Sequence, residues 1–190
     1  KITGGGNLIL GSESFKNAEL KGNTGDGSSI TYELTGGATM ANTNSNRYFR
    51  WTTVGAYVAK GVTLCLSVMY KPVSGADEFC MEIAYTAGYS TSQSWATIKP
   101  TDQLEIEQTD GWVLRYGLWT PPDNATLKLV DMGSGTTHAG TGNYTNKFSL
   151  LHPMLQYGNA PTAWNASSGD YLTQESAKSL FSQTADEIKT

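Results

Sequence analysis

The chain has 190 residues, a formal net charge of −4 and only 16% charged residues, with 21 glycines, ten tyrosines and five tryptophans. This length fits one β-sandwich with tails, and the composition favours many strands joined by polar turns over a helical protein. The basic residues form no stripe that could follow phosphates, which argues against a nucleic-acid partner, and no apolar run approaches the roughly 20 residues that cross a bilayer.

The pattern along the chain predicts one domain with two tails. Residues 1–6 are glycine-rich and form a linker, because they have nothing to bury. Residues 7–168 form the domain, and residues 169–190 form a C-terminal linker or helix. The start of the chain lacks the apolar stretch of a signal peptide, so we expect a piece of a longer protein.

The first half of the domain alternates apolar and polar residues as strands do. We expect strands at residues 7–10, 30–35, 47–53, 63–70 and 79–85. In residues 47–53, Phe49 and Trp51 share one face and Tyr48 and Arg50 the other, and either face could be the buried one. In residues 63–70, the face with Leu64, Leu66, Val68 and Tyr70 is expected to be the core face.

The second half continues the pattern, with strands expected at residues 95–98, 104–107, 112–119, 125–130 and 147–155. Arg115 and Trp119 fall on a common face of residues 112–119. After Tyr171 the apolar residues recur at spacings of three and four, which predicts a short amphipathic helix. Its apolar stripe consists of Leu172, Ala177, Leu180, Phe181, Ala185 and Ile188.

The two cysteines, Cys65 and Cys80, fall in neighbouring predicted strands. Pairing is conceivable, but the spacing alone does not establish it. We expect free thiols, because buried reduced cysteine is common.

Three segments resemble jelly-roll carbohydrate-binding modules. Residues 110–129, DGWVLRYGLWTPPDNATLKL, are similar to the penultimate strands of such modules. Residues 151–170, LHPMLQYGNAPTAWNASSGD, resemble the closing motif of modules of the family 4/9 type in tail proteins of phages that infect Gram-positive bacteria. Residues 5–12 are similar to their start, and residues 182–189 resemble a linker that often follows them. The chain departs from the pattern at Gln156, where an acidic residue is common, and at Asn165, where proline is common.

The resemblance implies an all-β jelly-roll β-sandwich, of the galactose-binding-like kind, in a phage or prophage baseplate, distal-tail or tail-associated protein. It implies a non-catalytic role in host adhesion, at the bacterial surface, with wall polysaccharide or teichoic acid sugars and other tail proteins as partners. No membrane partner is expected. The isolated domain is expected to be a monomer that becomes multivalent in the virion. A structural spacer without sugar binding is the alternative.

Sugar binding needs flat aromatic faces for the apolar side of a pyranose and planar polar groups for its hydroxyls. We expect Trp51, Trp95 and Trp119 as platforms, although aromatic residues at alternating strand positions are more often core. Trp95 has the more polar context. Further ligand-binding residues are expected at the rim: Tyr48, Tyr89, Arg50 and Arg115.

Catalysis and transition-metal binding are not expected. Carboxylates that could pair by number alone are Asp77, Glu78, Glu82, Glu105, Glu107 and Asp131, but no motif selects two of them. His138 and His152 lack ligands at a zinc-like spacing. No cofactor is expected, while a structural calcium, implied by the family, could take oxygens from Glu13, Asp26 and Asp170.

Overall fold

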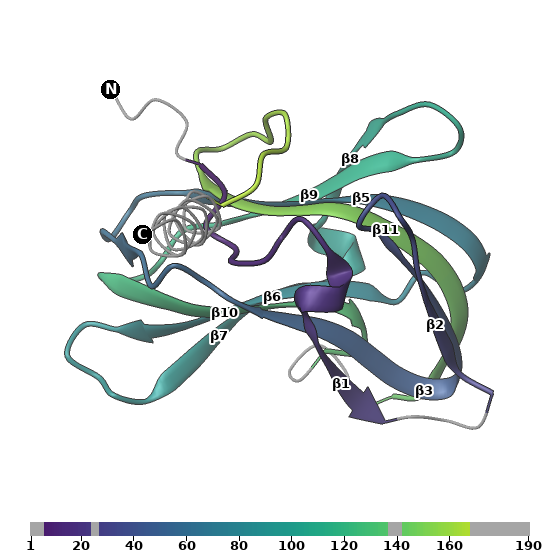
Figure 1. Ribbon diagram of the computed structural model, residues 1–190. Helices are drawn as coiled ribbons and strands as arrows, with labels where there is room; N and C mark the ends of the chain where they lie inside the picture. Colours follow the sequence, from purple (N-terminus) through teal and green to yellow (C-terminus); the bar gives the residue numbers. More distant parts are fainter. Residues whose placement is uncertain (1–5, 24–26, 137–141, 168–190) are drawn as a thin grey trace, which may run out of the picture.

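Two antiparallel sheets face each other in the computed structural model, which describes residues 6–23, 27–136 and 142–167. Figure 1 shows them one above the other, and we call them the upper and lower sheets. The lower sheet has the order β7-β6-β10-β3-β1, with β4 beside β10. Its strands are β1 (Glu19–Asn23), the second half of β3 (Ala38–Thr52), β4 (Tyr57–Val58), β6 (Phe79–Ala87), β7 (Gln93–Ile98) and β10 (Ala125–Ser134).

The upper sheet has the order β2-β3-β11-β5-β9-β8 and shares β3 with the lower sheet. Its further strands are β2 (Ser29–Tyr32), β5 (Leu64–Gly75), β8 (Leu104–Glu107), β9 (Val113–Trp119) and β11 (Tyr144–Tyr157). Two short 3₁₀ turns, η1 (Phe15–Asn17) and η2 (Pro100–Asp102), complete the described elements. The predicted all-β jelly-roll sandwich is confirmed. The predicted C-terminal helix lies outside the described residues and stays a prediction.

The core lies between the sheets and follows the predicted alternation. Leu64, Leu66, Val68 and Tyr70 are all buried. In β3 the buried pair is Phe49 and Trp51, whose rings pack edge-on against Phe15 with centroids 4.9 and 5.0 Å away. Tyr48 and Arg50 therefore lie on the outer face of the lower sheet.

The expected strands are wrong in several places, among them residues 7–10 and the start of β3. Residues 7–10 form only isolated bridges, Asn7 with Ser167 and Ile9 with Thr53, in place of a strand. The reason is that the side-chain oxygen of Asn7 accepts the backbone N–H groups of Ile9 and Leu155. In a regular sheet these groups would donate to a neighbouring strand. Strand β3 begins nine residues before the predicted start at Arg47.

The segment after β11 covers part of the outer face of the upper sheet. The Gln156 amide donates to Ala160 O at 2.7 Å and accepts from Thr162 at 2.7 Å. The Asn165 side chain accepts the N–H of Asn7 at 3.1 Å. An acid at 156 could not donate, which gives a physical reason for one departure from the family pattern. The described part of the chain contains no helix long and apolar enough to span a membrane.

The cysteines are free, as predicted. Cys65 lies on the outer side of the upper sheet, beneath the segment after β11, whereas Cys80 lies on the outer side of the lower sheet. The core separates the two thiols, so no disulfide can join them. Both side chains are buried.

We expect both thiols to be almost unreactive in the folded protein. Burial raises the pKa of Cys65 and of Cys80 from 9.0 to about 12. Because the thiolate is the reactive form, the reaction with Ellman's reagent at pH 8 should be about a thousandfold slower than in guanidinium chloride. Rapid labelling of the native protein would contradict this placement.

Candidate functional site

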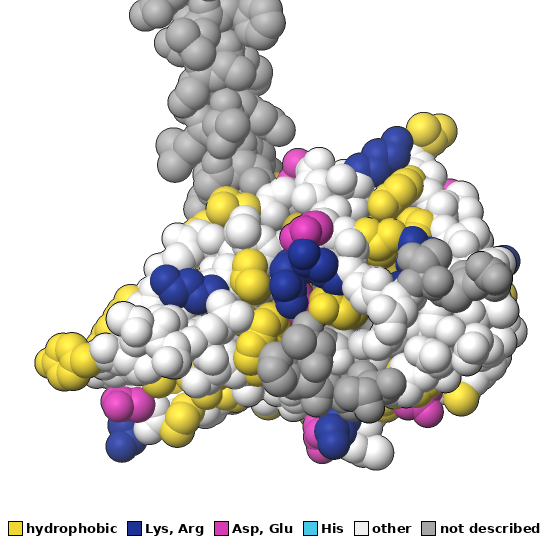
Figure 2. Space-filling view, turned by 90° about the horizontal axis from the view of Figure 1, so that it is seen from below, with side chains coloured by type: hydrophobic (Ala, Val, Ile, Leu, Met, Phe, Trp, Pro, Cys, Tyr) yellow, Lys and Arg dark blue, Asp and Glu magenta, His cyan; other side chains and the backbone are white. Residues whose placement is uncertain are grey.

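The strand register brings five side chains into line across the outer face of the lower sheet. Arg50 pairs with Glu19 of β1 on one side and with Asp131 of β10 on the other, Asp131 pairs with Glu82 of β6, and Glu82 pairs with Thr97 of β7. Because paired residues point to the same side of a sheet, these side chains form one polar line, which we call the Arg50 row. Seen from below, Figure 2 shows charged side chains beside hydrophobic ones near the middle of this face.

Arg50 holds the centre of the row. Its Nε and Nη2 atoms donate to the two carboxylate oxygens of Asp131, at 2.8 and 2.7 Å. The guanidinium carbon lies 5.6 Å from the ring centroid of Tyr48 and 5.3 Å from that of Trp95. The hydrogen bonds to Asp131 are the largest influence on the pKa of Arg50 and raise it, so this side chain stays charged.

Two of the three carboxylates of the row are buried, although they lie on the outer side of a sheet, whereas Glu19 is exposed. Asp131 and Glu82 are both 0% exposed. One oxygen of Glu82 accepts the Thr97 hydroxyl at 3.1 Å. Buried charge is costly unless it is hydrogen-bonded, so this line is fixed in position. The result is a rigid planar polar group between two aromatic rings.

The structure brings together three of the residues predicted for ligand binding: Tyr48, Arg50 and Trp95. Trp95 is half-buried and lies two residues before Thr97 on the same face of β7. Tyr48 follows the same alternation as Arg50, although its exposed fraction is only 8%. These three side chains remain the proposed contacts.

Three other predicted residues point into the sandwich. Trp51 is 2% exposed and offers no ring face to a ligand. Trp119 and Arg115 do share a face of β9, as predicted, but it is the inner one, because their partners in β5 are the core residues Leu64 and Val68. Trp119 packs on Tyr85, with ring centroids 4.6 Å apart. Strand alternation shows which residues share a face, but it does not show whether that face points into the core or toward solvent.

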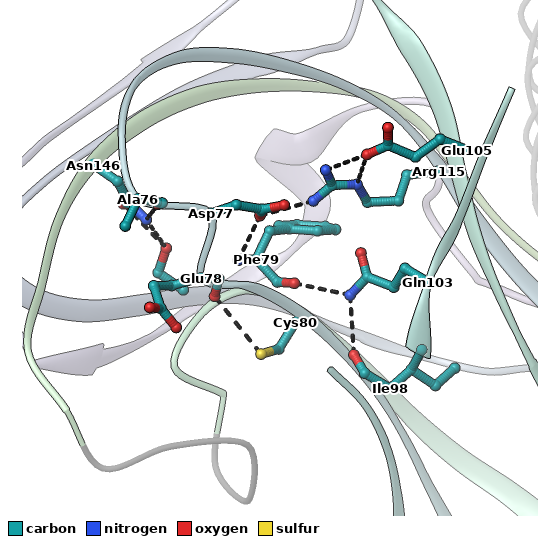
Figure 3. A network of polar contacts seen from close by, with 11 residues as sticks. Ala76, Asp77, Glu78, Phe79, Cys80, Ile98, Gln103, Glu105, Arg115 and Asn146 are labelled. Carbon is teal, nitrogen blue, oxygen red and sulfur yellow. Dashed lines mark hydrogen bonds and ion pairs between the residues drawn. The ribbon is translucent and has the colours of Figure 1, made fainter. Parts of the chain in front are cut away.

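Arg115 closes one end of the sandwich (Figure 3). It donates to Asp77 of the β5–β6 turn at 2.8 Å and to Glu105 of β8 at 2.9 Å. Its guanidinium also lies over the ring of Tyr70, 3.9 Å from the centroid. Burial lowers the pKa of Arg115, but the hydrogen bonds to both carboxylates outweigh it, and the net pKa is raised. Its donors are thus committed to structure.

Tyr89 lies away from the Arg50 row. It belongs to the loop between β6 and β7, with an exposed fraction of 108%, and lines a separate hollow of about 370 Å³ with Tyr57 and Asp123. On the opposite side of the molecule, Trp112 and Lys71 line a hollow of about 330 Å³ on the upper sheet. Trp112, a tryptophan on the other sheet, is therefore the matched control for Trp95 in binding experiments.

Sequence reasoning did not select Asp131, Glu82 or Thr97 for the site. The two acids were noted only as carboxylates that could pair by number, because nothing in a single sequence reveals which acids a register will align. An arginine on the outer face of residues 47–53 predicts a carboxylate partner on a neighbouring strand. The sequence left open which face of residues 47–53 is the outer one.

The described residues contain no group of three or more side chains that could hold a metal ion. Glu13 is exposed and accepts the Asn17 amide at 2.8 Å. Asp26, Asp170 and His138 lie outside the described residues, so the calcium set stays a prediction. His152 stacks on Trp164, with centroids 4.5 Å apart, and burial lowers its pKa.

Comparisons with known proteins concern the fold. No family model matches the chain, and no curated protein matches its sequence. The enzymatically active domain of tailspike protein 4 from bacteriophage CBA120 superposes with a TM-score of 0.52 at 11% identity, covering 80% of this chain and 21% of the tailspike. This chain thus spans about a fifth of that tailspike's length.

Carbohydrate-binding modules are also among the structural neighbours. A family 16 module superposes with a TM-score of 0.46 at 14% identity, covering 78% of this chain and 99% of the module. The family 11 module from Clostridium thermocellum, in complex with a β-1,3-1,4-mixed-linked tetrasaccharide, gives a TM-score of 0.41 at 15% identity and covers 84% and 99%. Such distant similarity concerns the fold alone.

Proposed function

We propose that this chain is a non-catalytic carbohydrate-binding module of a phage tail protein, which attaches the virion to host cell-wall saccharides. The observation that carries the proposal is Arg50, held between the rings of Tyr48 and Trp95 and fixed by Asp131. The ligand is a wall polysaccharide or the sugar part of a teichoic acid. The module would act at the surface of a Gram-positive host.

The chemistry of this face suits a pyranose. The indole of Trp95 offers an apolar ring to the C–H side of the sugar. Arg50 supplies a planar guanidinium group, and Thr97 of β7 lies in the same row. Because the row is locked by its own hydrogen bonds, little side-chain entropy remains to be lost on binding.

A binding role suits this face better than hydrolysis. A glycosidase needs two carboxyl groups placed on either side of the glycosidic bond. In the Arg50 row, both oxygens of Asp131 accept hydrogen bonds from Arg50, and Glu82 accepts one from Thr97. These acids hold the row together.

The phage-tail part of the proposal rests on the motifs of residues 5–12 and 151–170. In the structure both motifs meet at Asn7, which bonds Pro153 O at 2.8 Å and Asn165 O at 3.1 Å. A phage tailspike shares the fold. Affinity per site is expected to be weak, and multiple copies in the tail would supply avidity.

The test uses the tagged chain on cells and purified wall polysaccharide of Gram-positive bacteria, with Trp95→Ala and Trp112→Ala as matched variants. Wild type and Trp112→Ala should label saturably. Trp95→Ala should lose about 2 kcal/mol of binding free energy, roughly a 30-fold loss of affinity.

Two results would count against the proposal. Equal labelling by Trp95→Ala and wild type would remove the site from the lower sheet. No labelling of any host by the folded wild type would favour a structural spacer in the tail.

A further inference from the structure

The outer face of the lower sheet continues beyond the Arg50 row toward the β6–β7 loop. Thr126 of β10 pairs with Tyr57 of β4 on one side and Thr86 of β6 on the other, and Thr86 pairs with Gln93 of β7. We call this line the Tyr57 row. It points outward, because the neighbouring residues Val58, Ala125 and Leu127 all face the core.

The Tyr57 row ends at the hollow of about 370 Å³ lined by Tyr57, Tyr89 and Asp123. Tyr57 is 61% exposed and Tyr89 is 108% exposed. Neither ring contributes to the core, and both line one hollow, so together they offer apolar ring faces to a ligand there. Asp123 places an exposed carboxylate beside them.

The backbone around this hollow is fixed by Asn124. Its side-chain oxygen accepts the N–H of Lys60 at 3.0 Å, its carbonyl accepts the N–H of Gly88 at 2.7 Å, and its own N–H donates to Asp123 at 2.7 Å. Gly88 has φ +54°, and a Cβ there would lie 3.2 Å from Asp123 Oδ2. These bonds join the β4–β5, β6–β7 and β9–β10 loops, so the backbone beside the two tyrosines is fixed in position.

We propose that this hollow is a second saccharide subsite and that the ligand is a chain of several sugar units lying along the lower sheet. The inference rests on the proposed function of the Arg50 row. The stretch of β10 from Thr126 to Asp131 is five residue steps long, which corresponds to roughly 16 Å at about 3.3 Å per residue. One sugar ring cannot span that length, whereas a short oligosaccharide can.

The lining also indicates the kind of sugar. Two phenol rings offer apolar faces, and Asp123 accepts hydrogen bonds from hydroxyl groups. No lysine or arginine is among the described lining residues Tyr57, Ala87, Gly88, Tyr89, Asp123 and Asn124. A neutral or amino-bearing sugar unit fits this subsite, and a phosphate group does not.

The test measures affinity against fragment length. The probes are di- and trisaccharides and longer fragments from partial hydrolysis of the wall polysaccharide that binds the wild type. The variants are Tyr57→Ala, Tyr89→Ala and Trp95→Ala, with Leu34→Ala as a control that removes another fully exposed apolar side chain, 107% exposed. Since both tyrosines are exposed, their loss should not affect folding.

Longer fragments should bind wild type and Leu34→Ala at least tenfold more tightly than short ones. Each tyrosine variant should lose most of that gain and bind short fragments normally, while Trp95→Ala should weaken both. Undiminished length dependence in Tyr57→Ala and Tyr89→Ala, or no length dependence in the wild type, would overturn the subsite and leave the proposed function standing. Failure of every fragment and the intact polysaccharide to bind the wild type would overturn both.

Discussion

Replacing Asn7 with alanine should cost about 3–5 kcal/mol of the unfolding free energy. Asn7 is 1% exposed, donates to Ser12, Pro153 and Asn165, and accepts from Ile9 and Leu155. Alanine leaves the two buried N–H groups without their acceptor, and each costs about 1–3 kcal/mol, whereas the Pro153 carbonyl keeps the Trp164 indole N–H as a donor. Typical domains have only about 5–15 kcal/mol in total.

Chemical denaturation of the variant measures this loss directly. Asn17→Ala is the matched control, because Asn17 is exposed and donates to Gly11 O and Glu13. Its loss should stay below about 1 kcal/mol. A similar small loss in Asn7→Ala would show that the side chain does not tie the start of the domain to β11.

Replacing Arg50 with alanine should destabilise the fold and abolish saccharide binding together. The change removes the cation that is hydrogen-bonded to both oxygens of Asp131, a carboxylate with 0% exposure. Breaking a buried ion pair from one side costs about 3–5 kcal/mol. Thermal or chemical unfolding measures the stability, and polysaccharide pull-down measures the binding.

The double variant Arg50→Met with Asp131→Leu separates the two effects. Exchanging a buried ion pair for apolar side chains is often close to neutral, so unfolding stability should return toward that of the wild type. Binding should stay lost, because the planar guanidinium group is gone. A stable double variant that still binds polysaccharide would show that Arg50 serves the fold alone.

Much of the fold follows from alternation in the sequence. Leu64, Leu66, Val68 and Tyr70 read as a core face and are one. The early part of β3 was missed because residues 38–46 are rich in threonine, asparagine and serine, which usually mark loops. Inside the sheet these polar groups satisfy one another, as when Asn42 donates to Asn146 at 2.9 Å. That pairing depends on a partner 104 residues away.

The edge strand β1 was missed for a related reason. Its residues, ELKGN, include no β-branched or aromatic side chain, and four of the five are exposed. Only pairing with β3 makes this segment a strand. Strand propensity predicts a strand well where alternate residues are also buried, and most of β1 is exposed.

Part of the candidate site could be predicted from the sequence. Alternation placed Tyr48 and Arg50 on one face, and the polar context singled out Trp95. It could not decide that Phe49 and Trp51 take the core, since η1 supplies the ring of Phe15 that packs on both. The Asp131 and Glu82 partners depend on the register of β10 with β3 and β6, which a single sequence does not encode locally.

The most direct test of the central claim is a two-dimensional NMR titration that follows the indole N–H signals of the five tryptophans while wall polysaccharide fragments are added. The five signals report three places: the lower face (Trp95), the core (Trp51, Trp119) and the upper sheet (Trp112, Trp164). We expect the Trp95 signal to shift saturably and the other four to change little. A shift of Trp112 or Trp164 with Trp95 unchanged would contradict a binding face centred on Arg50.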